Sequence, residues 1–283
     1  MAISMTTPRY YDGTLRQYQR WWADGTDCCH FGWNPGRPLR SHADSLRAMV
    51  FALASTAHLH TGGPKRILDA GSGLGGPARL LAATYGAEVV AVTNSPVQRA
   101  YCERGPADPR IRWELADMTA TAYPPASFDA VWALESTGHV DRDAFLREAG
   151  RLLKPGGVLA MADGIALIDP AIWPAADRAH YQAWREAWSL TGIDTLPEWQ
   201  ARFDRASDAW TVTLHDWTPQ VTRSLHRLTR LCRRSRWAVR GARRLGRLSD
   251  AAYANILGAQ HLTALFTRHR VGYAAIIAVK SKE

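Results

Sequence analysis

The sequence predicts an α/β fold, a mostly parallel seven-stranded sheet with helices on both faces. Between residues 65 and 163, short apolar runs rich in β-branched residues alternate with helical segments, a pattern typical of parallel strands joined by helices. The first apolar run ends in a glycine-rich turn, Gly71–Gly76, that leads directly into a helix. The 283 residues, 46% hydrophobic and 22% charged, are enough for one large domain with its own core.

Seven segments are predicted as strands because each is short, apolar and bounded by turn residues. They cover residues 65–71, 88–94, 110–118, 127–134, 156–164, 210–217 and 271–280. Helices are predicted between them from their caps: one ends at Gly86, and another begins after Ser95 with Pro96 in its first position. A third covers residues 142–154.

The remaining segments are predicted to be helical additions to this core. Residues 8–61 form helices interrupted by a Gly- and Pro-containing loop, and residues 168–207 form a helical, Trp-rich interruption of the sheet. We therefore expect four parts. These are an N-terminal helical flap (1–64), a ligand-binding core (65–167), a helical cap (168–208) and a C-terminal part of the core that carries an arginine-rich helix (209–283).

The N-terminus, the apolar runs and the cysteines indicate the compartment in which the protein is expected. The N-terminus has no apolar signal segment, no run of apolar residues is long enough to span a membrane, and the four cysteines form no disulfide-like framework. We therefore expect a cytoplasmic protein without stable membrane insertion. Cys28, Cys29 and His30 are spaced too tightly for a structural zinc site, so no protein-bound metal is expected.

The net charge of +9 arises from one segment. Residues 223–247 contain ten of the 35 basic residues and none of the 26 acidic ones. Three interpretations remain open for this helix: it binds a diphosphate or carboxylate of the substrate, it rests on an anionic membrane, or it is solvated without a partner. Nucleic acid is not the expected partner, since no second basic element accompanies the helix.

The glycine turn is the sharpest functional motif. Asp69 precedes Gly71, Ser72 and Gly73 at the carboxyl end of the first strand, where open parallel sheets bind ligands and where glycine lets a ligand approach the backbone. A dinucleotide-binding domain is the competing interpretation. It would require an acidic residue after the second strand, where this chain has Thr93-Asn94.

Residues 65–163 resemble the cofactor-binding region of class I S-adenosylmethionine-dependent methyltransferases, whose fold is Rossmann-like. The segment Val92–Gln98 is similar to the polar version of the second strand end found in the branch that methylates sterols, geranyl diphosphate and small metabolites. The resemblance implies S-adenosylmethionine as the cofactor. It also implies a set of cofactor-binding residues: Asp69, Gly71, Ser72, Gly73, Thr93, Asn94, Gln98, Asp117 and Met118. His30 joins them because His30-Phe31-Gly32-Trp33 resembles the segment that folds over the cofactor in this branch.

The same resemblance assigns the chemistry to the end of the fourth strand. Glu135-Ser136-Thr137 looks like the Glu-Ser-Thr stretch of geranyl diphosphate C-methyltransferases. It implies that Glu135 is the general base, which would remove a proton from the carbocation formed when an alkene is methylated. His139 is expected to help or to bind the substrate. A purely structural role is the alternative for both residues.

Aromatic residues concentrate in the flap and the cap and indicate an apolar acceptor. We expect the substrate to contact Trp33, Tyr18, Trp184, Trp188, Arg223 and Arg227, with aromatic faces stabilising cations by roughly 1–2 kcal/mol each. Plain helix packing is the alternative for any one Trp. Mg²⁺ is expected only if the acceptor carries a diphosphate.

The sequence thus predicts a methyltransferase of specialised metabolism that acts on a small, largely apolar molecule, with C-methylation of an isoprenoid or alkene preferred. O- or N-methylation of a natural product is the first alternative. A non-catalytic RNA- or membrane-binding protein on the same fold is the alternative from another class. The oligomeric state, a homodimer included, is left open.

Overall fold

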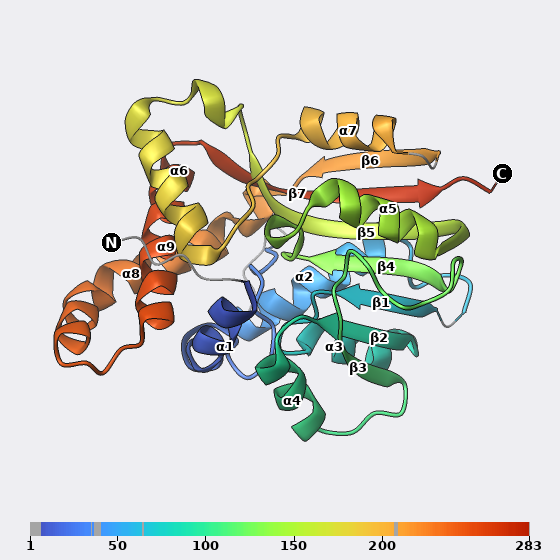
Figure 1. Ribbon diagram of the computed structural model, residues 1–283, viewed down its shortest axis with the longest axis horizontal. Coiled ribbons are helices and arrows are strands. Elements are labelled where there is room, and N and C mark those ends of the chain that lie inside the picture. Colours follow the sequence, from blue (N-terminus) through green and yellow to red (C-terminus); the bar gives the residue numbers. More distant parts are fainter. Residues whose placement is uncertain (1–6, 35, 37–40, 64, 207–208, 283) are drawn as a thin grey trace.

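The computed structural model describes residues 7–34, 36, 41–63, 65–206 and 209–282. Within those ranges seven strands form one sheet in the order β3-β2-β1-β4-β5-β7-β6 (Figure 1). The strands are β1 (Arg66–Ala70), β2 (Glu88–Thr93), β3 (Ile111–Leu115), β4 (Phe128–Leu134), β5 (Leu153–Ala166), β6 (Trp210–Asp216) and β7 (Val271–Lys280). Neighbours from β3 to β5 are parallel, and β7 runs antiparallel to β5 and β6. The predicted mostly parallel α/β sheet is confirmed.

The sheet has an apolar core on each face because successive side chains of a strand point to opposite sides. In the central strand β1, Ile67 belongs to one core and Leu68 to the other, and both side chains are 1% exposed. α2 (His42–Thr56) and α3 (Gly76–Tyr85) cover the Ile67 face. α5 (Arg142–Leu152) and α7 (Leu196–Arg205) cover the Leu68 face (Figure 1).

The predicted helix caps form as expected. The Ser95 hydroxyl accepts a hydrogen bond from the Gln98 amide at the start of α4 (Pro96–Arg104), which lies beside β2 and β3. Gly86 ends α3 in the left-handed conformation, with φ of 66°. These caps fix where each helix starts or stops relative to the strand ends.

Helices from both ends of the chain gather at the carboxyl ends of the parallel strands, on the left of Figure 1. They are α1 (Thr7–Gln17), the π-helical turn Tyr18–Trp22, α6 (Ala175–Trp188), α8 (Thr218–Arg244) and α9 (Asp250–Thr267). α9 packs against α1, α6 and α8 and joins these segments into one layer. No helix in the described ranges is both long and apolar enough to cross a lipid bilayer.

The two long helices within residues 168–208 have different neighbours. α6 packs on α9, whereas α7 packs beside β6. Trp199 and Phe203, one helical turn apart on α7, are buried in the core of the Leu68 face. The aromatic face of α7 therefore covers the sheet, and the part of the predicted cap that lies at the strand ends is α6 with the segment that follows it.

Candidate functional site

The turn after β1 has a backbone that favours glycine. Gly71, Gly73 and Gly75 have φ values of 90°, 55° and 84°, in the left-handed region where a Cβ is disfavoured. Asp69, just before the turn, is 2% exposed, and burial raises the pKa of its carboxyl to about 7. Its Oδ2 and the Ser72 Oγ are buried without a hydrogen-bond partner among the described residues. Since buried polar atoms are normally paired, this turn suits a ligand that brings hydrogen-bond donors.

The end of β2 presents an amide instead of a carboxylate. The Thr93 hydroxyl donates to Gln98 Oε1 at 2.7 Å and accepts from the Ser95 amide. The Gln98 side-chain nitrogen thus remains available as a donor, and Asn94 beside it is exposed. This pairing suits hydroxyl groups of a ligand.

The end of β3 supplies one carboxylate and one thioether. Asp117 Oδ1 accepts hydrogen bonds from the amide and the hydroxyl of Thr119, at 2.8 and 2.7 Å, which orients the carboxylate. Met118 is 8% exposed and belongs to the core of the Leu68 face. Together they offer a hydrogen-bond acceptor and an apolar contact, which suit the amine and the flat face of a purine ring.

Two adjoining cavities of the described structure lie at this edge of the sheet. The first has a volume of about 160 Å³, and the second, of about 520 Å³, lies between the π-helical turn, α8 and α9. They share Tyr18, Cys29, Phe31, Glu135 and Trp188. The first cavity is lined by every predicted cofactor-binding and catalytic residue: Asp69, Gly71, Ser72, Gly73, Thr93, Asn94, Gln98, Asp117, Met118, His30, Glu135 and His139.

Only half of the predicted substrate residues reach these cavities. Tyr18, Trp184 and Trp188 line them. Trp33 instead packs edge-on against Trp217, with ring centroids 4.4 Å apart. Arg223 and Arg227 line neither cavity. The reason is the helical period of α8: Leu225 and Leu228 face the interior, so the arginines flanking them project elsewhere.

Glu135 lies where the two cavities meet. Its backbone is left-handed, with φ of 53°, at the turn that follows β4. Oε1 accepts hydrogen bonds from the Phe31 amide at 2.6 Å and from the Tyr273 hydroxyl at 2.7 Å, while Oε2 accepts none from the described residues. Burial raises the pKa of the carboxyl to about 8, although those two donors oppose the shift. The result is a carboxyl group that exchanges a proton near neutral pH, with one oxygen held and one available.

His139 is held by hydrogen bonds on both ring nitrogens. Nδ1 lies 3.3 Å from the Ser189 carbonyl oxygen, which can only accept, so Nδ1 carries the proton. Nε2 then accepts from the Tyr11 hydroxyl at 2.7 Å. Burial lowers the pKa of the imidazole, which keeps it neutral. The hydrogen bond between Tyr11 and His139 thus links α1 to the turn after β4, and both residues line the first cavity.

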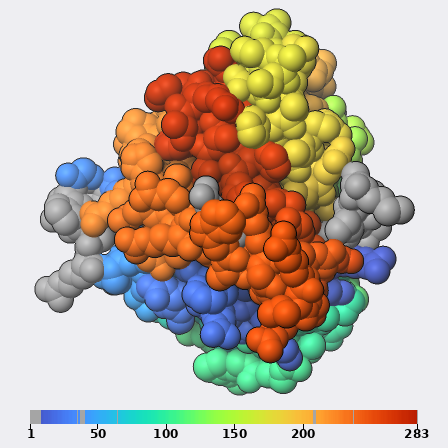
Figure 2. All heavy atoms as spheres, turned by 90° about the vertical axis from the view of Figure 1, so that its left-hand side faces the viewer, coloured from blue at the N-terminus to red at the C-terminus, as the bar shows by residue number. Residues whose placement is uncertain are grey.

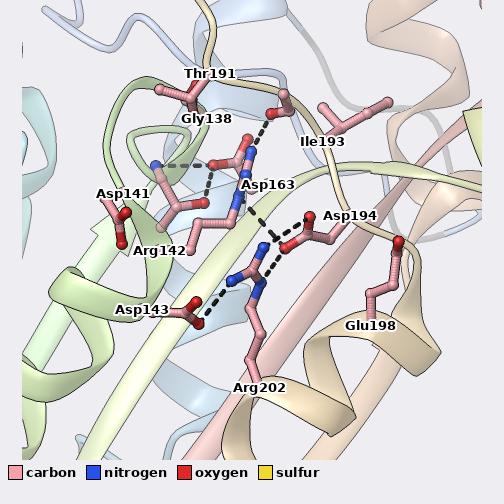
Figure 3. A network of polar contacts seen from close by, with 12 residues as sticks. Gly138, Asp141, Arg142, Asp143, Asp163, Thr191, Ile193, Asp194, Glu198 and Arg202 are labelled. Atoms are coloured by element: carbon pink, nitrogen blue, oxygen red, sulfur yellow. Dashed lines mark hydrogen bonds and ion pairs between the residues drawn. The ribbon is translucent and has the colours of Figure 1, made fainter.

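A buried ion-pair network fixes the loop beside His139 (Figure 3). Asp194 accepts from Arg202 Nε at 2.6 Å and lies 3.6 Å from Arg142 Nε, while Arg142 also donates to the Gly192 carbonyl. The Thr191 amide donates to the Gly138 carbonyl at 2.8 Å. The network joins α5, α7 and the segment after α6. It therefore fixes the two segments beside the imidazole, which carry the Gly138 and Ser189 carbonyls.

Residues of the N-terminal flap form the remaining wall of the site, through the His30 imidazole and the tyrosine hydroxyls of α1 and the π-helical turn. His30 is 3% exposed and donates from Nδ1 to the Phe31 carbonyl, while its buried Nε2 has no hydrogen-bond partner among the residues that the structure describes. Burial lowers the pKa of His30 to about 4, so Nε2 is an acceptor at neutral pH. Tyr18 donates to the Tyr10 hydroxyl, which donates to Asn255 of α9 at 2.7 Å.

Several site residues were not predicted from the sequence. They are Tyr11, Phe31, Asp163 and Tyr273, which all line the first cavity. Asp163 accepts from the amide and hydroxyl of Thr137 at 3.0 and 2.6 Å; its place near the end of a predicted strand was a usable signal. No local pattern indicates Tyr273, since it reaches Glu135 from a strand 138 residues away.

Comparisons with known proteins agree with this geometry. A family model described as a methyltransferase domain matches residues 68–161. The 2-methyl-6-phytyl-1,4-hydroquinone methyltransferase of Synechocystis is 36% identical over 57% of this chain and 55% of its own. The 27-O-demethylrifamycin SV methyltransferase of Amycolatopsis mediterranei is 36% identical over 56% and 61%, respectively. The chain thus spans little more than half the length of these curated relatives.

The fold is shared over nearly the whole chain with a solved structure. Geranyl diphosphate C-methyltransferase of Streptomyces coelicolor, in complex with Mg²⁺, geranyl diphosphate and S-adenosylhomocysteine, superposes with a TM-score of 0.68. The match covers 97% of this chain and 96% of that one at 20% identity, which establishes the fold alone. The chain therefore carries a methyltransferase domain of the class I, S-adenosylmethionine-dependent type.

Proposed function

We propose that this protein transfers the methyl group of S-adenosylmethionine to a carbon atom of an isoprenoid-derived or similar apolar alkene. The observation that carries this proposal is the position of Glu135, a half-buried side chain whose carboxyl lies at the junction of the two cavities. One cavity has the polar groups for a nucleoside amino acid, and the other has walls made mainly of apolar side chains from α8, α9 and the π-helical turn.

The residues of the first cavity fit the cofactor group by group. The unpartnered Asp69 Oδ2 suits its cationic amine, because an ion pair would compensate the burial of that carboxylate. The Gln98 amide and Asn94 suit the ribose hydroxyls, and Asp117 with Met118 suits the adenine. When bound, the cofactor supplies an electrophilic methyl group on a sulfonium.

The residues around the junction provide the rest of the chemistry. Phe31 and Tyr273 hold Oε1 of Glu135, so Oε2 is the oxygen that takes a proton from the methylated, cationic acceptor. Tyr18, Trp188 and Phe31 surround the same point and exclude water. Aromatic faces there stabilise a carbocation until the proton leaves.

The charge around the cavities favours a neutral acceptor over a diphosphate. Of the arginines and lysines that the structure describes, only Arg234 contributes to a cavity wall, in the second cavity. A diphosphate needs several cations close by. The proposal for a prenyl diphosphate therefore has less support than the proposal for an uncharged isoprenoid.

O-methylation is the second candidate, and His139 favours it. The neutral imidazole of His139 lines the first cavity and would take the proton of an acceptor hydroxyl that replaces the Tyr11 hydroxyl on Nε2. The relative named for 27-O-demethylrifamycin is as similar as the hydroquinone methyltransferase. For that reaction no carbocation is needed, and Glu135 would position the acceptor.

The location of the new methyl group distinguishes the two candidates. The protein is incubated with ¹³C-methyl-labelled S-adenosylmethionine and, separately, a prenylated hydroquinone, a sterol and geranyl diphosphate. We expect NMR of the product to show the label bonded to carbon in a prenylated hydroquinone or sterol. Label on oxygen alone would support the O-methyltransferase, and no product from any acceptor, with S-adenosylhomocysteine still bound, would contradict the proposed acceptor class.

A pair of glycine variants tests the cofactor turn. Gly71→Ala and Gly86→Ala both place a Cβ on left-handed backbone, at a cost of about 1–2 kcal/mol in the free energy of unfolding. The Cβ at position 71 would lie 2.5 Å from Ser136 Cβ, whereas that at position 86 meets nothing within 4 Å. Calorimetry should therefore show weaker S-adenosylhomocysteine binding for Gly71→Ala alone. Equal affinity of both variants would count against the turn as the cofactor site.

A further inference from the structure

The positive charge of this protein is concentrated on one surface. α8 and the turn after it, residues 223–247, carry ten arginines and no acidic residue, so the rest of the chain, with 25 basic and 26 acidic residues, has a net charge of −1. Of the nine whose side chains the structure describes, eight are exposed: Arg223, Arg230, Arg233, Arg234, Arg240, Arg243, Arg244 and Arg247. Figure 2 shows this face, where α8 runs in orange above the N-terminal helices in blue.

Large apolar side chains are exposed among these arginines. Trp237 and Leu245, on and just after α8, are 65% and 67% exposed, and Trp21 on the π-helical turn is 60% exposed. Arg240 lies over the Trp237 ring at 5.3 Å, and Arg20 lies over the Trp21 ring at 5.2 Å. Exposed tryptophans beside arginines are typical of surfaces that sit in the headgroup region of a bilayer. The exposed leucine also suits a lipid headgroup region better than the phosphates that dominate binding to nucleic acid.

The second cavity opens between these two elements. Its wall includes three exposed residues, Trp21, Arg234 and Ala238, so it reaches the surface where the arginines and tryptophans gather. Its inner wall is formed by Leu228, Leu231 and other apolar residues of α8, and it ends at Glu135. An apolar passage thus leads from the basic face to the candidate base.

We propose that α8 and the π-helical turn Tyr18–Trp22 dock on the surface of an anionic lipid bilayer. The exposed arginines contact the headgroups, and Trp21, Trp237 and Leu245 enter the headgroup region. The opening of the second cavity then faces the membrane, so a lipophilic acceptor can enter without crossing water. This route for the acceptor rests on the proposed methyl transfer, whereas the docking itself does not.

Vesicle binding tests the docking without any acceptor. The protein is sedimented with vesicles of phosphatidylcholine alone and with vesicles that contain roughly a third of phosphatidylglycerol. We expect binding to the anionic vesicles only, weakened by added salt. The double variant Arg240→Glu/Arg244→Glu should reduce the partition coefficient by more than about tenfold, since each basic residue near an anionic surface contributes about fivefold.

A matched control shows whether vesicle binding depends on the arginines of α8 or only on the net charge of the protein. Arg104→Glu/Arg205→Glu makes the same change in net charge at exposed positions of α4 and α7, and should bind vesicles as the unmodified protein does. The charge-preserving pair Trp237→Ala/Leu245→Ala should also weaken binding if apolar side chains enter the headgroup region. Circular dichroism confirms that each variant is folded.

Three results would overturn the proposal. They are no binding to anionic vesicles, equal loss in both charge-reversal variants, or salt-sensitive binding to RNA with none to vesicles. A failure of methyl transfer to every acceptor would leave these measurements unaffected, because vesicle binding is read without cofactor or acceptor.

Discussion

Glu135→Gln is expected to slow methylation of a carbon acceptor by about 10²–10⁴-fold, the range that a lost general base usually costs. Glutamine is isosteric and its carbonyl oxygen can still accept from the Phe31 amide and the Tyr273 hydroxyl, so the contact with the flap is kept. Binding of S-adenosylhomocysteine, measured by calorimetry, should therefore change little. A variant that retains full activity would end the role of Glu135 as a base.

The pH dependence of the same reaction gives an independent test. Burial raises the pKa of Glu135 to about 8, so the carboxyl is increasingly protonated, and unable to take a proton, as the pH falls below that value. The rate should rise with pH and level off above about 8. Tyr273→Phe removes a hydrogen bond that favours the ionised form, so it should move this rise to higher pH. A pH profile that Tyr273→Phe does not shift would show that another group titrates.

Asp69→Asn is expected to weaken binding of S-adenosylhomocysteine by about 10–100-fold, because a hydrogen bond to a charged group contributes roughly 1.5–3 kcal/mol. The carboxyl of Asp69 is buried and its Oδ2 has no partner in the described structure, so the amine of the ligand is the natural one. Burial raises its pKa to about 7. Affinity should therefore fall as the pH is lowered through 7 in the unmodified protein, and less so in the variant.

A truncated ligand provides the control for Asp69. Methylthioadenosine keeps the adenine and ribose but lacks the amino-acid part, so Asp69→Asn should leave its affinity nearly unchanged. Equal weakening of both ligands would mean that Asp69 supports the turn and does not bind the amine. A gain in the stability of the unliganded variant is expected at neutral pH, since the raised pKa shows that ionised Asp69 opposes folding there.

The sequence determined the sheet and the cofactor edge because the signals are local. Strands such as Glu88–Thr93 are apolar on both faces, and caps such as Ser95 and Gly86 are visible within a few residues. Apart from His30 of the flap, the positions predicted to bind the cofactor lie at or shortly after the carboxyl end of a strand. Parallel strands bring these ends to one edge whatever lies between them. Those residues line one cavity for that reason.

The tertiary structure alone decided the acceptor side, because its walls come from segments far apart in the chain. Tyr273 holds Glu135 across 138 residues, and Tyr11 meets His139 across 128. The direction of Trp33, Arg223 and Arg227 depends on how α8 and the flap pack, which composition does not specify. None of the three lines either of the two cavities described above. Periodicity gives the face of a helix, but only packing decides which neighbour that face meets.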